Sequence, residues 1–340
     1  MTEYFALYAN CIPVTGSKRS ILCDLQRSTF HFIPNILAEK LLAERYFIVE
    51  QWMEEHNHEH DETISQYVSF LIDQEFGFIT DEPELFPAMS TEWISPAYVT
   101  NAVIDRNGIP KITLSAIVTK LEAEGCIAIK INYSGRTTID FIKTELRVFA
   151  ESGIRSVTIT FDKDYLSKKE LTELFQLENR LHQIQVFNSI NSTVEKISHK
   201  GIIRYSDRKQ GIYYPKERYE NFSISIPFFT ESLHHHTFFN RKIFVDNKGE
   251  IRNLPSGESF GNIESSNLRE LISDKKFSRY FNIKKNELPV CNKCEFRNIC
   301  QDNRIPYQDF QGKWQFKNPC GYNPDLMKWN DESGYEIPSS

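Results

Sequence analysis

The chain has few of the features that mark membrane, secreted or phosphate-binding proteins. Over its 340 residues no apolar run approaches the roughly 20 residues that span a bilayer, so we expect no membrane partner. The first residues show no basic segment followed by an apolar core, so we expect no signal peptide and a cytoplasmic protein. Glycine is scarce, with 14 residues, and Gly125, Gly135 and Gly153 form no phosphate-binding fingerprint.

An excess of positive charge is also lacking. Lys and Arg number 40 against 46 Asp and Glu, and the formal net charge of −6 weighs against a general nucleic-acid binder. No spacing of Ser, His and Asp indicates a nucleophile, so we assign no catalytic residue. The composition that remains, 40% hydrophobic and 25% charged, is typical of globular domains, and the length predicts two or three of them.

The first eighty residues predict a small domain of strands and helices. Strand patterns at 4–9, 20–25 and 29–33 are followed by helical patterns at about 34–41, 47–55 and 61–75, and by a closing strand at 78–80. This is the order of a winged-helix domain. The third helical pattern contains no Lys or Arg, which disfavours DNA as its ligand.

Strands and helices alternate beyond a linker at 83–96, which holds three prolines. From 97 to 230 the pattern predicts four or five parallel βαβ units, too few for a complete barrel but enough for a partial one. Ser167 and Glu170 predict a capping box. Residues 223–226 predict a strand, and residues 243–252 predict a hairpin.

Seven cysteines are present, and four of them are clustered. Cys291, Cys294, Cys300 and Cys320 follow the pattern C-x2-C-x5-C-x19-C in a loop-rich tail. An odd number of cysteines in a reducing compartment argues against a disulfide framework and favours a metal centre. Four thiolates at this spacing suit either zinc or an iron–sulfur cluster, and the spacing alone leaves both open.

The chain resembles a known family at both ends. The residues that carry the resemblance are Asn240-Arg241-Lys242-Ile243, Lys248-Gly249-Glu250-Ile251, Phe260-Gly261-Asn262-Ile263, the run from Cys291 to Cys300, Cys320-Gly321-Tyr322-Asn323-Pro324 and, near the start, Asn10-Cys11-Ile12-Pro13-Val14. They are similar to SPASM-domain peptide maturases of grasp-with-spasm systems. Such proteins are encoded beside an ATP-grasp ligase and a short precursor peptide.

The resemblance implies one [4Fe–4S] cluster on Cys291, Cys294, Cys300 and Cys320. SPASM domains usually hold a second cluster, but its ligand positions here read His234-His235-His236-Thr237, Leu254 and Asn303-Arg304. Leu254 cannot ligate iron, so a second centre is not expected. The motif CxxxCxxC of radical-SAM enzymes is also missing after the strand pattern at 98–104, as in the grasp-with-spasm relatives. We therefore expect no adenosyl radical chemistry and a degenerate barrel.

The first domain resembles a PqqD-like recognition element, in which an extended leader peptide adds to a sheet edge beside a helix. The candidate peptide-binding residues are Thr29, Phe30 and Phe32 on the third strand pattern and Tyr67, Phe70 and Leu71 on the third helical pattern. The alternative is that these side chains belong to the core, where aromatic stripes are usually found.

Together these observations predict an α/β protein of consecutive parts: a winged helix at 1–82, a linker at 83–96, a partial (β/α) barrel at 97–230 and a SPASM tail at 231–340. The expected function is that of an accessory protein that binds a ribosomal precursor peptide and acts with an ATP-grasp ligase. The alternatives are an enzyme that modifies the peptide with its auxiliary cluster, a structural zinc-binding adaptor, and a winged-helix regulator that senses iron or redox state.

Overall fold

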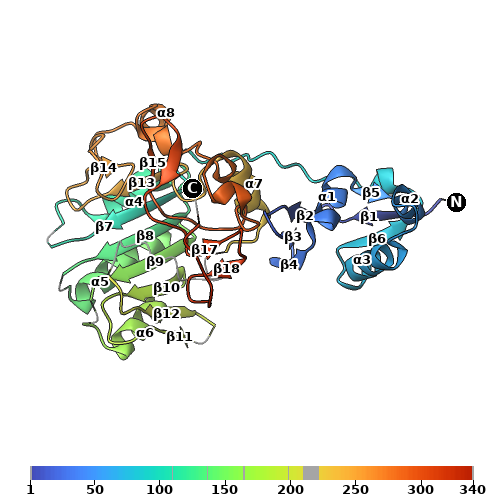
Figure 1. Ribbon diagram of the computed structural model, residues 1–340. Coiled ribbons are helices and arrows are strands. Elements are labelled where there is room, and N and C mark those ends of the chain that lie inside the picture. The colour runs from blue at the N-terminus through green and yellow to red at the C-terminus, as the bar shows by residue number, and fades with distance from the viewer. Residues whose placement is uncertain are drawn as a thin grey trace. The chain divides into compact units, whose positions relative to one another are not determined.

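The computed structural model describes residues 2–108, 110–135, 137–163, 165–197, 199–209 and 222–338 (Figure 1). These residues group into two compact units. The terminal unit contains residues 2–93, 222–238 and 283–338, and the sheet unit contains residues 94–209 and 239–282. This grouping differs from the four consecutive segments expected from the sequence, because the first and the last residues of the chain share one unit.

The first 93 residues of the terminal unit form two small sheets and three helices. In chain order the elements are β1 (Tyr4–Leu7), β2 (Cys11–Val14), β3 (Ser20–Asp24), β4 (Thr29–Ile33), α1 (Asn35–Ala43), β5 (Tyr46–Phe47), α2 (Val49–Glu55), α3 (Asp61–Asp73) and β6 (Gly77–Thr80). One sheet has the order β5-β1-β6 and the other β2-β3-β4. The predicted strands and helices are present, and β2, which contains Pro13, is an addition that the sequence did not predict.

Strand β3 is buried along its whole length because both faces of its sheet are covered. Successive side chains of a strand point to opposite faces. Leu22 packs into one apolar core with Leu37 of α1 and Leu71 of α3. Ile21 and Cys23 pack on the other face into a second core. Its members from the end of the chain are Phe296, Ile299, Tyr322 and Trp329, together with Phe229 of α7 (Ile226–His234).

The rest of the terminal unit is short of regular structure. Besides α7 it holds two small hairpins, β15 (Pro306–Gln308) with β16 (Trp314–Phe316) and β17 (Tyr322–Asn323) with β18 (Lys328–Trp329). The strand predicted at 223–226 is wrong. Ser225 caps α7 by accepting a hydrogen bond from the backbone of Phe228, and Pro227 suits the first turn of a helix, so capping overrides the alternating pattern.

The sheet unit confirms the α/β class, because its core is one large mixed sheet. The strands are β7 (Asn101–Asp105), β8 (Ala128–Tyr133), β9 (Ser156–Phe161), β10 (Leu181–Val186), β11 (Thr193–Ile197), β12 (Gly201–Tyr205), β13 (Lys242–Val245) and β14 (Ile251–Arg252). Their order is β11-β12-β10-β9-β8-β7-β13-β14, so the sheet has two edge strands. The neighbours from β12 to β13 pair in parallel, while β11 and β14 are antiparallel edges.

Three helices connect successive parallel strands: α4 (Leu114–Ala123), α5 (Ile139–Leu146) and α6 (Lys168–Leu177). Parallel crossovers are right-handed, so connections that step along the sheet in one direction place these helices on one face. The capping box of Ser167 and Glu170 is confirmed at the start of α6. The predicted hairpin is present as β13 and β14, and it extends the large sheet beside β7. Helix α8 (Leu268–Ser273) follows.

None of the helices in the described ranges is both long enough and apolar enough to cross a membrane.

Candidate functional site

The edge strand β4 and the cysteine loop, defined here as residues 291–300 with Cys320, are in contact within the terminal unit. The ring of Phe296 contacts two rings of β4, with centroid distances of 5.8 Å to Phe30 and 6.0 Å to Phe32. Phe222 adds a third ring at 4.7 Å from Phe296. Phe296 itself is 1% exposed. The predicted peptide strand therefore rests directly on the loop that carries the cysteines.

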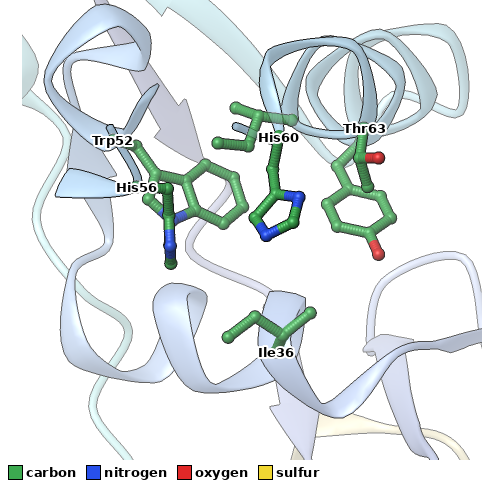
Figure 2. Close-up of a pocket in the computed structure, with 7 residues that line it drawn as sticks. Ile36, Trp52, His56, His60 and Thr63 are labelled. Carbon is green, nitrogen blue, oxygen red and sulfur yellow. The ribbon is translucent and has the colours of Figure 1, made fainter. Parts of the chain in front are cut away.

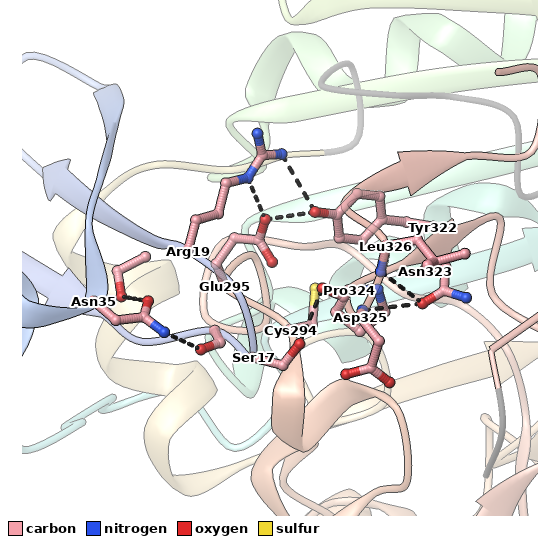
Figure 3. A network of polar contacts seen from close by, with 12 residues as sticks. Ser17, Arg19, Asn35, Cys294, Glu295, Tyr322, Asn323, Pro324, Asp325 and Leu326 are labelled. Carbon is pink, nitrogen blue, oxygen red and sulfur yellow. Dashed lines mark hydrogen bonds and ion pairs between the residues drawn. The ribbon is translucent and has the colours of Figure 1, made fainter. Parts of the chain in front are cut away.

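A polar network lies beside these rings (Figure 3). Arg19, in the turn before β3, forms an ion pair with the buried Glu295 at 2.9 Å, and the hydroxyl of Tyr322 donates to the same carboxylate oxygen at 2.5 Å. The Arg19 guanidinium also stacks over the ring of Phe32 at 3.7 Å. Burial and the Glu295 carboxylate both raise the pKa of Tyr322, which keeps its hydroxyl protonated as the donor.

The four clustered cysteines are free thiols; Cys291 is buried, and Cys294, Cys300 and Cys320 are half-buried against the second core. Burial raises the pKa of all four thiols, that of Cys291 to about 12. The nearby charge of Cys320 raises the pKa of Cys291, Cys294 and Cys300 further. Two cations oppose the effect. Arg304 lies 3.8 Å from the Cys291 sulfur, and the Lys285 ammonium donates to the carbonyl of Cys300. Both lower the pKa of Cys291, Cys300 and Cys320.

Across the described ranges, no group of three or more His, Cys, Asp or Glu side chains is arranged to hold a metal ion. The metal centre therefore remains a prediction. The charge of Cys320 nevertheless influences the pKa of the other three cysteines, and four thiols are the donor set that an iron–sulfur cluster uses. Arg304 and Lys285 place positive charge beside the cysteines of this loop.

The six predicted peptide-binding residues occupy different environments. Thr29 and Phe32 are exposed on β4, and Phe30 is half-buried. Tyr67 and Phe70 are half-buried on α3, and Phe70 lies 6.0 Å from the ring of His31 on β4. Leu71 is 0% exposed and belongs to the core, as the alternative reading of these residues allowed. The structure thus places β4 and α3 side by side, with five of the six side chains at least partly accessible.

The three consecutive histidines at 234–236 serve the structure around α7. His234 Nε2 lies 3.0 Å from the carbonyl oxygen of Thr91, and His235 packs edge to face on Trp93 at 4.8 Å. His236 is buried, and its Nδ1 accepts from the backbone of Phe238.

A buried ion pair lies at the carboxyl end of β7 in the sheet unit. Arg106 directly follows β7 and binds Glu145 of α5 through two guanidinium nitrogens, one at 3.2 Å. It also donates to the carbonyl of Ile112 at 2.8 Å, and the Tyr133 hydroxyl donates to Glu145 at 2.9 Å. Burial and the Glu145 carboxylate raise the pKa of Tyr133. Arg106, Glu145 and Tyr133 thus form one buried polar network at the end of β7.

Sequence reasoning missed the residues that join β4 to the cysteine loop. Arg19, Glu295, Phe296 and Tyr322 were not assigned a role, although Glu295 and Phe296 lie inside the cysteine motif. An acidic residue followed by an aromatic one between metal-ligand cysteines is a local signal that could have drawn attention to them.

Comparisons with known proteins yield few matches for this chain. No family model matches the chain, and no curated protein matches it. Among solved structures it is similar to Streptococcus suis SuiB bound to S-adenosylmethionine and to SuiB bound to the precursor peptide SuiA. Both align with 11% sequence identity and a TM-score of 0.37, over 87% of this chain and 94% of SuiB. At these values the likeness does not bear on what this chain binds.

Proposed function

We propose that this chain is an accessory protein of ribosomal-peptide maturation, which binds the leader of a precursor peptide along the outer edge of β4. The observation that carries the proposal is the position of β4 as the edge strand of its sheet, with α3 beside it. An extended peptide can add to such an edge through main-chain hydrogen bonds, while side-chain pockets give selectivity. In the part of the chain that the structure describes, β4 pairs with β3 alone.

Contacts on both faces of β4 support this role. His31 packs on Phe70 of α3, and Phe30 packs on Phe296 of the cysteine loop. An edge strand held from both sides is ordered before a peptide arrives, which lowers the entropy cost of binding. Phe32, 41% exposed, remains available to a side chain of the peptide.

The metal centre in this proposal is one [4Fe–4S] cluster held by Cys291, Cys294, Cys300 and Cys320. With four thiolates it would have no open coordination position, so it would cross-link the loop that supports β4. Arg304 and Lys285 would offset its charge, and Phe296 and Trp329 would exclude water. A structural zinc ion on the same four thiolates is the alternative.

The remaining parts of the proposal rest on the family resemblance. The first 82 residues act as a PqqD-like recognition domain, residues 83–96 as a linker, residues 97–230 as a barrel remnant and residues 231–340 as a SPASM tail. The partner that modifies the bound peptide is an ATP-grasp ligase, and the chain works with it in the cytoplasm. Residues 210–221 of the barrel segment lie outside the described residues.

The test uses the full chain, because the cysteine loop covers one face of the β2-β3-β4 sheet. A fluorescent synthetic leader, taken from the short precursor gene expected beside this one, is titrated with the protein. Two further leaders carry N-methyl groups on alternate backbone amides, offset by one residue. In strand addition only every second backbone amide of the peptide pairs with the edge strand. One of the two methylated leaders should therefore bind about 100-fold more weakly, and the other should bind like the unmethylated leader. Equal affinity of the two series would contradict binding at the β4 edge.

A further inference from the structure

A pocket opens among α1, α2, α3 and the loop that joins α2 to α3 (Figure 2). Its volume is about 280 Å³. It is lined mainly by Ile36 of α1, Trp52 of α2, Thr63 and Tyr67 of α3, and the loop histidines His56 and His60. Pockets for whole small ligands span roughly 300–1,000 Å³, so this one suits a single large side chain.

The walls of the pocket are aromatic and largely fixed. Trp52 is 2% exposed, and the ring of Tyr67 stacks on it at 6.4 Å with an interplanar angle of 26°. His56 and His60 meet edge to face at 5.9 Å. Ile36 is 50% exposed at the opening. The two histidines of the loop between α2 and α3 are therefore part of an apolar pocket.

The pocket continues the candidate peptide site along α3. Tyr67 lies one helical turn from Phe70, which contacts His31 on β4. Ile36 lies in the first turn of α1, and α1 begins two residues after β4 ends. A peptide that runs along β4 from Thr29 towards Ile33 would thus arrive at the pocket.

The segment that forms the pocket is strongly acidic. Residues 34–75 contain ten Asp and Glu against two basic residues, Lys40 and Arg45. Lys40 is paired with Glu44 at 3.0 Å and Glu55 at 3.1 Å, and Arg45 donates to the carbonyl of Leu7 at 2.8 Å. Exposed carboxylates close in sequence to the lining residues include Glu54, Glu59 and Glu62. An occupant of this surface must bring positive charge to be complementary.

We propose that this pocket takes a bulky apolar side chain of a peptide whose flanking residues are Lys or Arg. The proposal rests on the proposed function and specifies its ligand. The leader pairs along β4 and inserts one apolar side chain into the pocket. Apolar burial supplies affinity, and the acidic surface selects basic peptides over acidic ones.

The probes are four fluorescein-labelled synthetic peptides of alternating Thr and Val. They carry a central Leu flanked by Lys, the same Leu flanked by Gln, the same Leu flanked by Glu, and a central Ala flanked by Lys. Fluorescence anisotropy with the full chain gives each dissociation constant at fixed ionic strength. We expect the Leu peptide with Lys to bind at least tenfold more tightly than the Ala peptide and than the Leu peptide with Glu.

Two pairs of variants locate the effect. Thr63→Trp fills the pocket from an exposed position on α3, and Ser65→Trp places the same side chain on another face of that helix. Glu62→Lys reverses a charge beside the lining residue Thr63, and Glu264→Lys reverses an exposed charge in the sheet unit. We expect Thr63→Trp and Glu62→Lys to weaken the Leu peptide with Lys about tenfold, and the two controls to leave it unchanged.

The outcomes separate this inference from the function on which it rests. If the Lys-flanked peptides bind but Thr63→Trp has no effect, the pocket proposal is overturned while strand addition at β4 stands. If no peptide of the panel binds, the preference for a basic apolar anchor is overturned, and the N-methylated leaders still test the β4 edge. Tighter binding of the Glu-flanked peptide would also overturn it.

Discussion

The ring of Phe30 on the edge strand β4 meets the ring of Phe296 in the cysteine loop edge to face, with centroids 5.8 Å apart and an interplanar angle of 74°. The two residues are 266 positions apart in the chain. This contact makes the order of β4 depend on the fold of the loop. Changes in the loop should therefore be felt at the peptide site.

Replacing Phe296 by Ala should destabilise the terminal unit by about 3–5 kcal/mol, because the side chain is fully buried among five aromatic rings. Leader binding should weaken as well, since Phe30 and Phe32 lose their support. Urea unfolding and anisotropy measure the two effects. Phe310→Ala, at a position 96% exposed, is the control and should change stability by less than about 0.5 kcal/mol. Equal effects of the two substitutions would contradict the role given to Phe296.

Removing the hydroxyl of Tyr322 should cost about 1.5–3 kcal/mol, because it donates to the buried carboxylate of Glu295. Tyr322→Phe tests this by urea unfolding, with Tyr307→Phe at an exposed position as the matched control. In a Glu295→Gln background the effect of Tyr322→Phe should shrink, because the charged acceptor is gone. Additive effects would show that the hydrogen bond contributes nothing measurable.

The four clustered cysteines predict the metal content of the protein. Protein purified without oxygen should contain about four iron and four sulfide per chain, as one [4Fe–4S] cluster requires. Cys294→Ser should lower both and loosen the loop against protease. Cys126→Ser is the control, because Cys126 lies in the sheet unit and donates to the carbonyl of Ala128, a bond that serine can keep. If the protein contained one equivalent of zinc and no sulfide, the prediction of a cluster would be wrong and the site would hold a structural zinc ion.

The stability of the β3–β4 turn should depend on pH through Asp24. Burial alone would raise the pKa of this carboxyl, but hydrogen bonds from Arg27 and from the backbone of Gln26 outweigh it and hold the pKa below its ordinary value. The contribution of Asp24 is thus present above the unfolded pKa of about 3.9 and is lost as the pH falls through the lower folded value.

Asp24→Asn should therefore destabilise the protein by about 1.5–3 kcal/mol at pH 7, with a difference that shrinks below about pH 4. Urea unfolding across this range measures it, and Asp73→Asn on the exposed surface of α3 is the control. A difference that is the same at pH 3 and pH 7 would show that the charge of Asp24 is not responsible.

The local features of the fold could be predicted from the sequence, and the long-range ones could not. The capping box of Ser167 and Glu170 depends on neighbours three residues apart, and the structure confirms it. The ion pair of Arg19 and Glu295 joins residues 276 positions apart, which no periodic pattern encodes. In the sequence of β3 the run Ile21-Leu22-Cys23 is a local sign that its sheet is covered on both faces, since a half-exposed strand alternates apolar and polar residues.

The candidate site was predicted in the same uneven way. The strand of Phe30 and Phe32 and the helix of Tyr67 are where the sequence put them, because strand and helix periods are local. The pocket of His56 and His60 was not predicted, because it forms only when α1, α2 and α3 pack together.

The second core, with Ile21 and Cys23 on one side and Ile299 and Trp329 on the other, has a consequence for synthesis of the chain. When only the first hundred residues have been synthesised, the β2-β3-β4 sheet still exposes one apolar face to water. That face is closed when the last segment emerges. The nascent chain therefore exposes an apolar surface to chaperones for most of translation. Only the completed chain holds β4 in the conformation that a precursor peptide would bind.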